Sequence, residues 1–153
     1  MAIRFARLED IETLVAYWRE FHSQSAFAHL TLDEVKLATT MRRLIEDKSG
    51  AFCFFVAEGE NGRPAGVIVG QMDSYYFSND PVAKMVFYWV HPQYRYSSIA
   101  VRLMLGLKQW AQNRRAKELS IAVTSGESIG VIDKMMRKMG GELKGGNYVI
   151  SGL

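Results

Sequence analysis

The stretch KMVFYWVHPQYRYSSIAVRLMLGLKQWAQNRRA, from Lys84 to Ala116, decides the fold of this chain. Its first part is a short apolar run rich in β-forming residues, which ends at the turn His91-Pro92. A small polar loop, Arg95 to Ser98, follows. The rest predicts a helix, because its apolar residues recur at spacings that place them on one face. These residues are Ala100, Leu103, Met104, Leu107, Trp110 and Ala111.

The loop between this strand and this helix is a candidate anion site. A strand that feeds a helix through a tight loop leaves the first N–H groups of the helix unpaired and pointing outward. Such a helix end attracts anions, phosphates above all. We therefore expect the turn to hold a pyrophosphate. The alternative is an ordinary helix start that a serine caps.

Length and composition indicate one globular domain, residues 1–153, with 48% apolar and 23% charged residues. A net charge of +3 is too small to imply a nucleic-acid partner. No apolar run reaches the roughly 18 residues that span a bilayer, and Met1 to Arg4 lack the apolar core of a signal peptide. The single cysteine, Cys53, lies in an apolar run that indicates a packed thiol. We expect a cytoplasmic protein without a membrane segment.

Apolar periodicity and turn residues predict the other elements. Helices are expected from Asp10 to Phe21, from a capping box at Thr31 and Glu34 to Gly50, and from Ser125 to Gly140. Asn61-Gly62 predicts a hairpin. Strands are expected at Ile3 to Ala6, Ala51 to Ala57, Ala65 to Met72, Lys84 to Val90, Glu118 to Val123, Glu142 to Lys144 and Asn147 to Ile150. The order β-α-α-β-β-β-α-β-α-β-β indicates a mixed α/β or α+β domain.

This order and the loop together resemble the GNAT family of acetyl-coenzyme-A-dependent N-acyltransferases. The resemblance extends from Ile3 to Ile150 and is most specific in the segment VHPQYRYSSIA, residues 90–100. Residues that match the family pattern there are Val90, Pro92, Tyr94, Arg95, Ile99 and Ala100. Tyr96 and Ser98 stand where the family usually has glycine, which lets the backbone approach phosphates.

The resemblance implies a single GNAT-like domain in which helices flank a mixed central β-sheet. It implies acetyl-CoA as the acyl donor and no metal. The strand before the loop would splay from the strand at Glu118 to Val123, and the pantetheine arm would enter between them. The cofactor-binding residues that it implies are Tyr88, Trp89, Val90, Arg95, Tyr96, Ser97, Ser98, Ile99, Ala100 and Ser128, with Arg102 as a further basic group.

Acyl transfer to an amine requires that the amine lose a proton and, in most cases, that the leaving thiolate gain one. Many relatives carry a Glu on the strand before the loop, but residues 85–90 contain no carboxylate. The candidate bases are therefore Asp73, His91 and Glu127, of which His91 has the best-suited ordinary pKa. Each of them also has a structural interpretation as a loop or helix-terminal polar group.

The general acid is less well defined. Met136 occupies the position at which the family pattern has Tyr, and a thioether cannot donate a proton. Tyr88 or Tyr148 could take that role, water could protonate the thiolate, or the protein does not catalyse.

Aromatic residues gather in the regions where an acceptor would bind. They are Trp18, Phe21, Phe27, Tyr75, Tyr76, Phe77 and Trp89. They suit an apolar amine, an aromatic amine or a peptide side chain. They would equally serve as packing beneath loops or as a homodimer contact.

The sequence thus predicts an N-acetyltransferase that moves an acetyl group from acetyl-CoA to a primary amine of a small molecule, a peptide or a protein. The alternative is a CoA-binding or interaction module that kept the GNAT fold and lost turnover. A basic binding protein without a coenzyme is a third interpretation.

Overall fold

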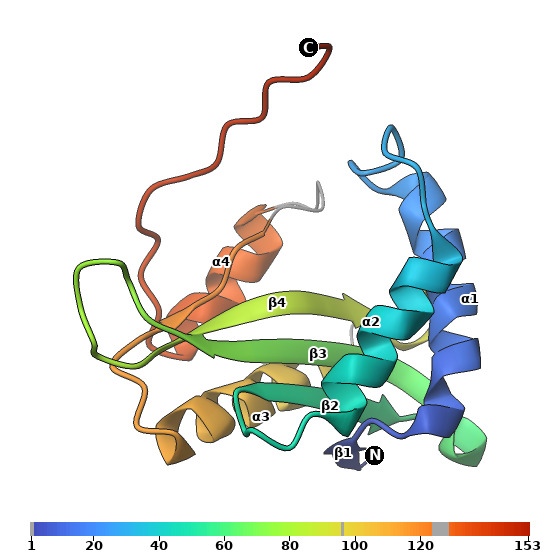
Figure 1. Ribbon diagram of the computed structural model, residues 1–153, viewed down its shortest axis with the longest axis horizontal. Coiled ribbons are helices and arrows are strands. Elements are labelled where there is room, and N and C mark those ends of the chain that lie inside the picture. Colours follow the sequence, from blue (N-terminus) through green and yellow to red (C-terminus); the bar gives the residue numbers. More distant parts are fainter. Residues whose placement is uncertain (1, 96, 124–128) are drawn as a thin grey trace.

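The computed structural model describes residues 2–95, 97–123 and 129–153, which form a three-layer α/β arrangement (Figure 1). In these residues the sheet has five strands in the order β1-β2-β3-β4-β5. All neighbours are antiparallel except the parallel pair β4–β5. The strands are β1 (Ile3–Phe5), β2 (Phe52–Glu58), β3 (Pro64–Asp73), β4 (Val82–Val90) and β5 (Leu119–Ser120).

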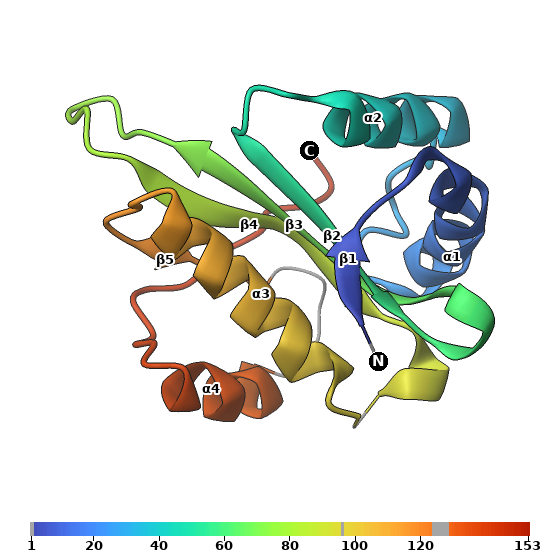
Figure 2. The same ribbon diagram turned by 90° about the horizontal axis from the view of Figure 1, so that it is seen from below.

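Helices cover both faces of this sheet. Helices α1 (Ile11–Gln24) and α2 (Glu34–Glu46) lie on one face, and α3 (Ile99–Asn113) and α4 (Ile129–Lys138) lie on the other (Figure 2). The predicted class, a mixed α/β sheet flanked by helices, is confirmed. None of the helices in the described ranges is long and apolar enough to cross a membrane.

The α3 face of the sheet is closely packed. Ile68, Ile99, Leu103 and Leu107 are each 0% exposed. Two glycines on β3 let the helix approach the strand. A Cβ at Gly70 would collide with the Leu107 side chain and lie 2.9 Å from Cys53 Sγ, and one at Gly66 would lie 3.0 Å from Leu103. Any larger residue at either position would push α3 away from the sheet.

Cys53 belongs to this closely packed face, as predicted. Its side chain is 1% exposed, and burial raises the pKa of the thiol to about 12. Because the thiolate is the nucleophilic form, this cysteine has no reactive role.

On the opposite face, α1 and α2 pack through a second cluster that includes Leu14, Met41, Phe54, Val69 and Trp89. Aromatic rings provide much of this contact. Trp18 stacks on Phe87 at 4.4 Å between ring centroids, and Phe21 meets Phe87 edge-on at 5.9 Å.

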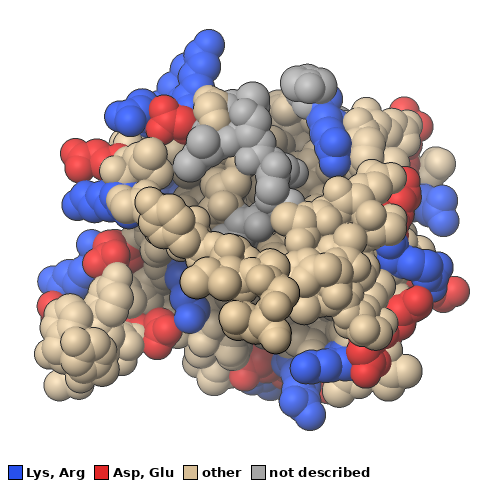
Figure 3. Space-filling model, turned by 90° about the horizontal axis from the view of Figure 1, so that it is seen from above, with Lys and Arg blue, Asp and Glu red and all other residues tan. Residues whose placement is uncertain are grey.

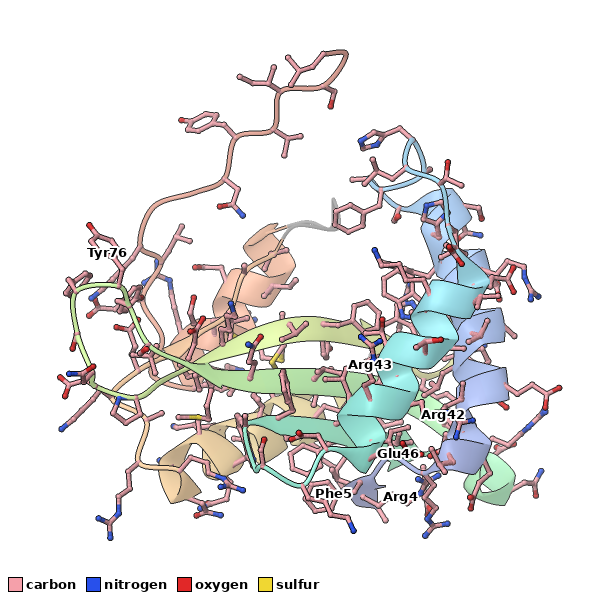
Figure 4. The ribbon with its side chains drawn as sticks, in the orientation of Figure 1. Arg4, Phe5, Arg42, Arg43, Glu46 and Tyr76 are labelled. Atoms are coloured by element: carbon pink, nitrogen blue, oxygen red, sulfur yellow. The ribbon has the colours of Figure 1, made fainter. Side chains whose placement is uncertain are left out.

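A buried ion pair fixes the start of α1 to the sheet edge. Asp10 is 4% exposed and accepts hydrogen bonds from both terminal nitrogens of Arg4, at 2.8 and 2.9 Å. It also accepts one from the Arg7 backbone N–H at 2.7 Å. Arg4, the middle residue of β1, lies at the lower margin of the molecule (Figure 4).

Two local predictions differ from the structure, and a third is confirmed. The cap of α2 is Asp33, whose carboxylate accepts from the Lys36 N–H at 2.9 Å, because the helix begins three residues after Thr31. The strand expected at 118–123 is limited to Leu119–Ser120, because its pairing with β4 stops there. The Asn61-Gly62 hairpin between β2 and β3 is confirmed.

The two strands predicted at 142–144 and 147–150 are wrong, because residues 141–153 contain neither helix nor strand. The pair Gly145-Gly146 interrupts this segment, and glycine loses the most backbone freedom on ordering. Tyr148 is 99% exposed and Val149 is 80% exposed. Strands this short need a neighbouring edge and a buried side-chain face, and these side chains have no such cover.

Candidate active site

The candidate site begins where β4 and β5 separate. Their parallel pairing consists of Ala83 with Leu119 and Lys84 with Ser120, and it goes no further. Beyond it, residues 85–88 of β4 and residues 121–123 after β5 line one pocket. The splay that the family resemblance implies is therefore present, and it leaves one edge of β4 open toward the pocket.

A β-bulge in β4 lies beside this opening. Val69 pairs with Phe87 and the next residue, Gly70, pairs with Met85, so Val86 is the extra residue. A bulge increases local twist and re-aims the side chains around it. Here Met85, Val86, Phe87 and Tyr88 all reach the pocket, whereas a regular strand would send alternate side chains to opposite faces.

The pocket has a volume of about 430 Å³, within the range of small-molecule sites. Its first wall comes from α1, α2 and their connection: Trp18, Phe21, Phe27, Leu37, Thr40, Met41 and Leu44. Its floor is the sheet: Phe54, Val69, Met85, Val86, Phe87 and Tyr88. Its second wall comes from α3, α4 and the segment after β5: Met104, Ile121, Ala122, Val123 and Ile132.

This lining is almost wholly apolar. Among the described lining residues the only side-chain polar groups are the hydroxyls of Thr40 and Tyr88 and the indole N–H of Trp18. The lining residues contributed by these described parts of the chain include no carboxylate, imidazole or cation. The face of the molecule seen from above is also largely uncharged in its centre, with charged side chains mostly at its margin (Figure 3).

The loop that precedes α3 is held by its own polar groups. Pro92–Tyr94 form a short 3₁₀ turn, and the Tyr94 hydroxyl accepts a hydrogen bond from the Glu60 N–H at 3.0 Å. Ser97 Oγ donates to the Tyr94 carbonyl at 2.5 Å and accepts from the Ile99 N–H at 3.3 Å. Ser97, rather than Ser98, therefore caps α3. The Ser98 side chain makes no capping bond and is exposed.

The predicted cofactor residues divide into two groups. The side chains of Trp89, Val90 and Ile99 are buried in the core, at 5%, 7% and 0% exposure, so only their backbone groups could meet a ligand. Arg95 and Ser98 are exposed around the start of α3, and Ser97 and Ala100 are half-buried there. Tyr96 and Ser128 lie outside the described residues, as does the candidate base Glu127.

The structure does not bring the three catalytic candidates together. Asp73 ends β3 opposite Val82, whereas His91 follows the far end of β4. Nine strand residues separate those two ends, which is roughly 30 Å. Asp73 is exposed and pairs with Lys84 at 3.1 Å. The hydrogen bond from the Ser74 N–H and this ion pair lower the pKa of Asp73, which makes it a weaker base.

His91 is a turn residue beside the pocket wall, not part of the lining. Its Nδ1 accepts a hydrogen bond from the Gln93 N–H at 3.2 Å and so caps the 3₁₀ turn. Its ring packs against Tyr17 at 4.9 Å and against Trp89 at 5.7 Å. With Nδ1 used as an acceptor, the neutral ring carries its hydrogen on Nε2.

Of Asp73, His91 and Tyr88, only Tyr88 lines the pocket. It is half-buried on β4, opposite Ile68, and packs against the α3 side of the sheet. Met136 packs against the same core from α4 and does not line the pocket. Tyr148 lies on the exposed C-terminal segment, so the structure does not bring its hydroxyl to the site.

The aromatic residues expected near an acceptor also divide. Trp18, Phe21 and Phe27 line the pocket, and Trp89 is buried beneath it. Tyr75, Tyr76 and Phe77 lie in the loop between β3 and β4, and Tyr76 projects at its tip, far from α1 and α2 (Figure 4).

Sequence reasoning missed two parts of the lining. The spacing of Leu37, Met41 and Leu44 predicts only that they share one side of a helix, and it gives no sign of the pocket beside them. Residues 121–123 were assigned to a strand. An apolar run that follows a short parallel strand without a partner of its own is the signal that could have identified them.

Comparison with known proteins agrees with this geometry. The sequence profile of the acetyltransferase (GNAT) family matches residues 11–136. The chain therefore belongs to the GNAT acetyltransferase family, whose members use acetyl-CoA as the cosubstrate. A search of curated proteins finds no match.

Solved structures of the same fold span the whole chain. One is a probable acetyltransferase with 16% identity and a TM-score of 0.75, covering 100% of this chain and 99% of the other. Another is the aminoglycoside 6'-N-acetyltransferase AAC(6')-Ih from Acinetobacter baumannii, with 18% identity, a TM-score of 0.70 and coverages of 99% and 98%. A third is AAC(6')-Iy in complex with the bisubstrate analog CoA-S-monomethyl-acetylneamine, with 18% identity, a TM-score of 0.66 and coverages of 99% and 96%. At these identities the likeness establishes the fold alone.

Proposed function

We propose that this protein is an acetyl-CoA-dependent N-acetyltransferase that acts on a primary amine. The observation that carries the proposal is the separation of β4 from β5 beside the start of α3, in a chain of the GNAT family. The separation opens onto a pocket deep enough for an acceptor. The open edge of β4 offers backbone groups to an extended ligand, and the first turn of α3 offers N–H groups to an anion.

Acetyl-CoA, when bound, supplies a thioester whose acetyl carbon bonds to the amine nitrogen while its carbon–sulfur bond breaks, which yields an amide and the thiol of coenzyme A. The loop of residues 95–100 would hold the pyrophosphate, with Arg95 beside it. Ser97 orders this loop by bonding both Tyr94 and Ile99. The departure from glycine at Ser98 is compatible with this role, because Ser98 has ordinary right-handed helical angles, φ −70° and ψ −7°.

Tyr88 is the residue that we assign to proton transfer. It supplies the only phenol among the described lining residues and belongs to the strand edge that faces the opening. Its hydroxyl would donate a proton to the departing sulfur, and the proton that the nitrogen loses on forming the amide would restore the phenol. Asp73 and His91 are not retained as catalytic groups, because neither lines the pocket.

Deprotonation of the amine follows from the same lining. An apolar environment disfavours the charged ammonium form and lowers the pKa of a bound amine. The neutral amine, which is the nucleophile, is therefore the form that the pocket prefers. Its excess proton would leave to solvent at the mouth.

The names of several structural neighbours also suggest an aminoglycoside as the acceptor. That acceptor carries several positive charges, and the described pocket lining provides no carboxylate to pair with them. The proposal is accordingly limited to a primary amine.

Two measurements test the proposal. Acetyl-CoA at 100 times its Kd should stabilise the folded protein by about 2.7 kcal/mol, which is a shift of several degrees in Tm. Release of free thiol in the presence of an amine panel then reports turnover. Absence of a shift at millimolar acetyl-CoA would contradict coenzyme binding. A shift without thiol release would favour the CoA-binding module that has lost turnover.

A substitution at the start of α3 locates the coenzyme. Ser98→Asp adds a negative charge where the pyrophosphate would lie and should abolish the acetyl-CoA shift while the fold persists. Gln112→Asp adds the same charge to the other end of α3, also at an exposed position, and should leave the shift intact. Retained binding in Ser98→Asp would show that the loop is not the phosphate site.

A further inference from the structure

We infer that the acceptor is a primary amine with an uncharged, apolar body, an alkyl or aryl amine, rather than a polycation such as an aminoglycoside. This inference rests on the proposed function, because it names the acceptor of the same pocket. It is carried by three features of the pocket: the composition of its walls, the position of its few polar groups, and the absence of acidic side chains from its described lining.

The wall built by α1, α2 and their connection is apolar except for the Thr40 hydroxyl and the indole N–H of Trp18. Trp18 and Phe21 project from α1, Phe27 from the connection, and Leu37 and Leu44 from α2. The ring contacts among Trp18, Phe21 and Phe87 hold these side chains in fixed relative positions. A rigid aromatic surface of this kind fits an aryl or alkyl group, because burial of apolar area is the gain that it can provide.

Of the three polar side chains in the described lining, only Tyr88 lies apart from that wall, because Trp18 and Thr40 belong to it. Tyr88 is on β4 at the open strand edge, beside the separation from β5. An acceptor therefore has one direction in which to bind. Its amine nitrogen lies toward Tyr88 and the thioester, and its body lies toward Trp18, Phe21 and Phe27. An acceptor with one amino group and one apolar body fits this arrangement.

A polycation cannot be accommodated in the same way. A buried ammonium group without a paired carboxylate or hydrogen-bond acceptors is strongly unfavourable. A single reacting amine avoids this penalty by losing its proton, whereas the additional ammonium groups of an aminoglycoside remain charged. The described lining provides neither carboxylates nor amide side chains to receive them.

The test compares acceptors of graded size at saturating acetyl-CoA, with thiol release as the measurement. We expect kcat/KM to rise along n-butylamine, n-hexylamine and n-octylamine by about fourfold for each added CH₂. We expect 2-phenylethylamine to be accepted. Kanamycin and a short lysine-containing peptide should give little or no thiol release.

A variant pair ties the preference to this pocket. Thr40 and Thr39 are adjacent exposed residues of α2, and only Thr40 lines the pocket. Thr40→Trp should narrow the pocket and reduce kcat/KM for n-octylamine roughly tenfold, with a smaller loss for n-butylamine. Thr39→Trp is the control and should leave both values unchanged. The acetyl-CoA shift in Tm should persist in both variants, which shows that both fold and bind the donor.

The outcomes separate the inference from the function. If kanamycin or the peptide is the better acceptor, or if kcat/KM is flat along the alkylamine series, the protein acetylates amines and the apolar acceptor class is wrong. An equal effect of the two tryptophan substitutions would place the acceptor elsewhere and overturn the assignment to this pocket. If acetyl-CoA produces no shift, the proposed function itself fails, and the inference fails with it.

Discussion

The two faces of one sheet behave differently in this molecule. On the α3 face, aliphatic side chains pack without exposure, and Gly66 and Gly70 bring the helix against β3. On the α1–α2 face, aromatic rings support a wall that stands open beside a cavity of about 430 Å³. The same strands supply both faces, because alternate residues point to opposite sides.

The difference indicates that the two faces have different roles, one mainly in stability and the other mainly in ligand binding. The close-packed face holds the sheet together, and among the described residues its helices border the pocket only through Met104 and Ile132. The opposite face extends to the region beyond Lys84 and Ser120, where the backbones of β4 and the segment after β5 are no longer paired. A binding site needs such a place, where part of the apolar surface remains uncovered until the ligand arrives.

The largest expected difference between the faces is in the free energy of unfolding. Leu103→Ala should cost about 4 kcal/mol, because the packed surroundings cannot collapse into the cavity that it leaves. Met41→Ala, at 5% exposure beside the pocket, should cost about 2 kcal/mol, because its surroundings already border open space. Urea unfolding of both variants measures the contrast. Equal costs would mean that the open face is packed as tightly as the closed one.

Catalysis should depend on Tyr88, which lines the pocket, and not on His91, which does not. Tyr88→Phe should lower kcat about a hundredfold through loss of a proton donor, with little change in the KM for acetyl-CoA. His91→Asn keeps a capping side chain at the 3₁₀ turn and should leave kcat within about threefold. Steady-state kinetics on an accepted amine would decide between them. If kcat fell sharply in His91→Asn and stayed normal in Tyr88→Phe, the catalytic role would belong to His91 and not to Tyr88.

Glycine substitutions test whether α3 packs closely against β3 at Gly70. Gly70→Ala should destabilise the fold by about 2 kcal/mol, since the added methyl group collides with Leu107 and Cys53. Gly106→Ala on α3 is the matched control. Its added Cβ would lie 3.8 Å from the nearest side chain, so it should stabilise the helix by about 0.5–1 kcal/mol. Thermal unfolding gives both values, and a stable Gly70→Ala would argue against a tightly docked α3.

The smallest expected effect is the pH dependence of stability that comes from the ion pair between Asp10 and Arg4 at the start of α1. Burial alone raises the pKa of Asp10, but the hydrogen bonds from Arg4 and the Arg7 N–H outweigh it, so the pKa lies below its usual 3.8. The carboxylate form therefore stabilises the fold above this usual value, and the stabilisation is lost as pH falls through the lowered folded pKa.

Asp10→Asn isolates this contribution. The wild type should lose stability between about pH 5 and about pH 2 more steeply than Asp10→Asn, which has no carboxyl group to protonate at that position. Urea unfolding at a series of pH values measures the two slopes. Parallel slopes would show that the ion pair with Arg4 contributes nothing to acid sensitivity.

Sequence patterns were sufficient for most of the fold. The periodicity of residues 99–113 predicted α3, and the apolar run before it predicted β4, because those signals lie within a single element. The prediction of two strands in the C-terminal segment was wrong, because a strand depends on more than the signals within one element. Residues 142–150 have strand-like composition, but a strand also requires an edge to pair with, which local composition does not reveal.

The candidate site was only partly accessible to the same reasoning. The sequence named Tyr88 and three aromatic residues that line the pocket, while the phosphate role of the loop before α3 stays a prediction. It also proposed Asp73 and His91 on grounds of side-chain chemistry, although Asp73 is at the opposite end of the strand pair and His91 caps a turn. Distances between elements decide such roles.

The amino-acid sequence by itself therefore determined the elements and their order as far as α4, and through the loop at 90–100 it indicated the family. Each of these depends on short-range signals: apolar period, turn residues and a motif. Only the tertiary structure decided where β4 and β5 part, that the bulge at Val86 turns consecutive side chains toward one cavity, and that this cavity is apolar. Those features depend on contacts between segments far apart in the chain, for which local composition carries no signal.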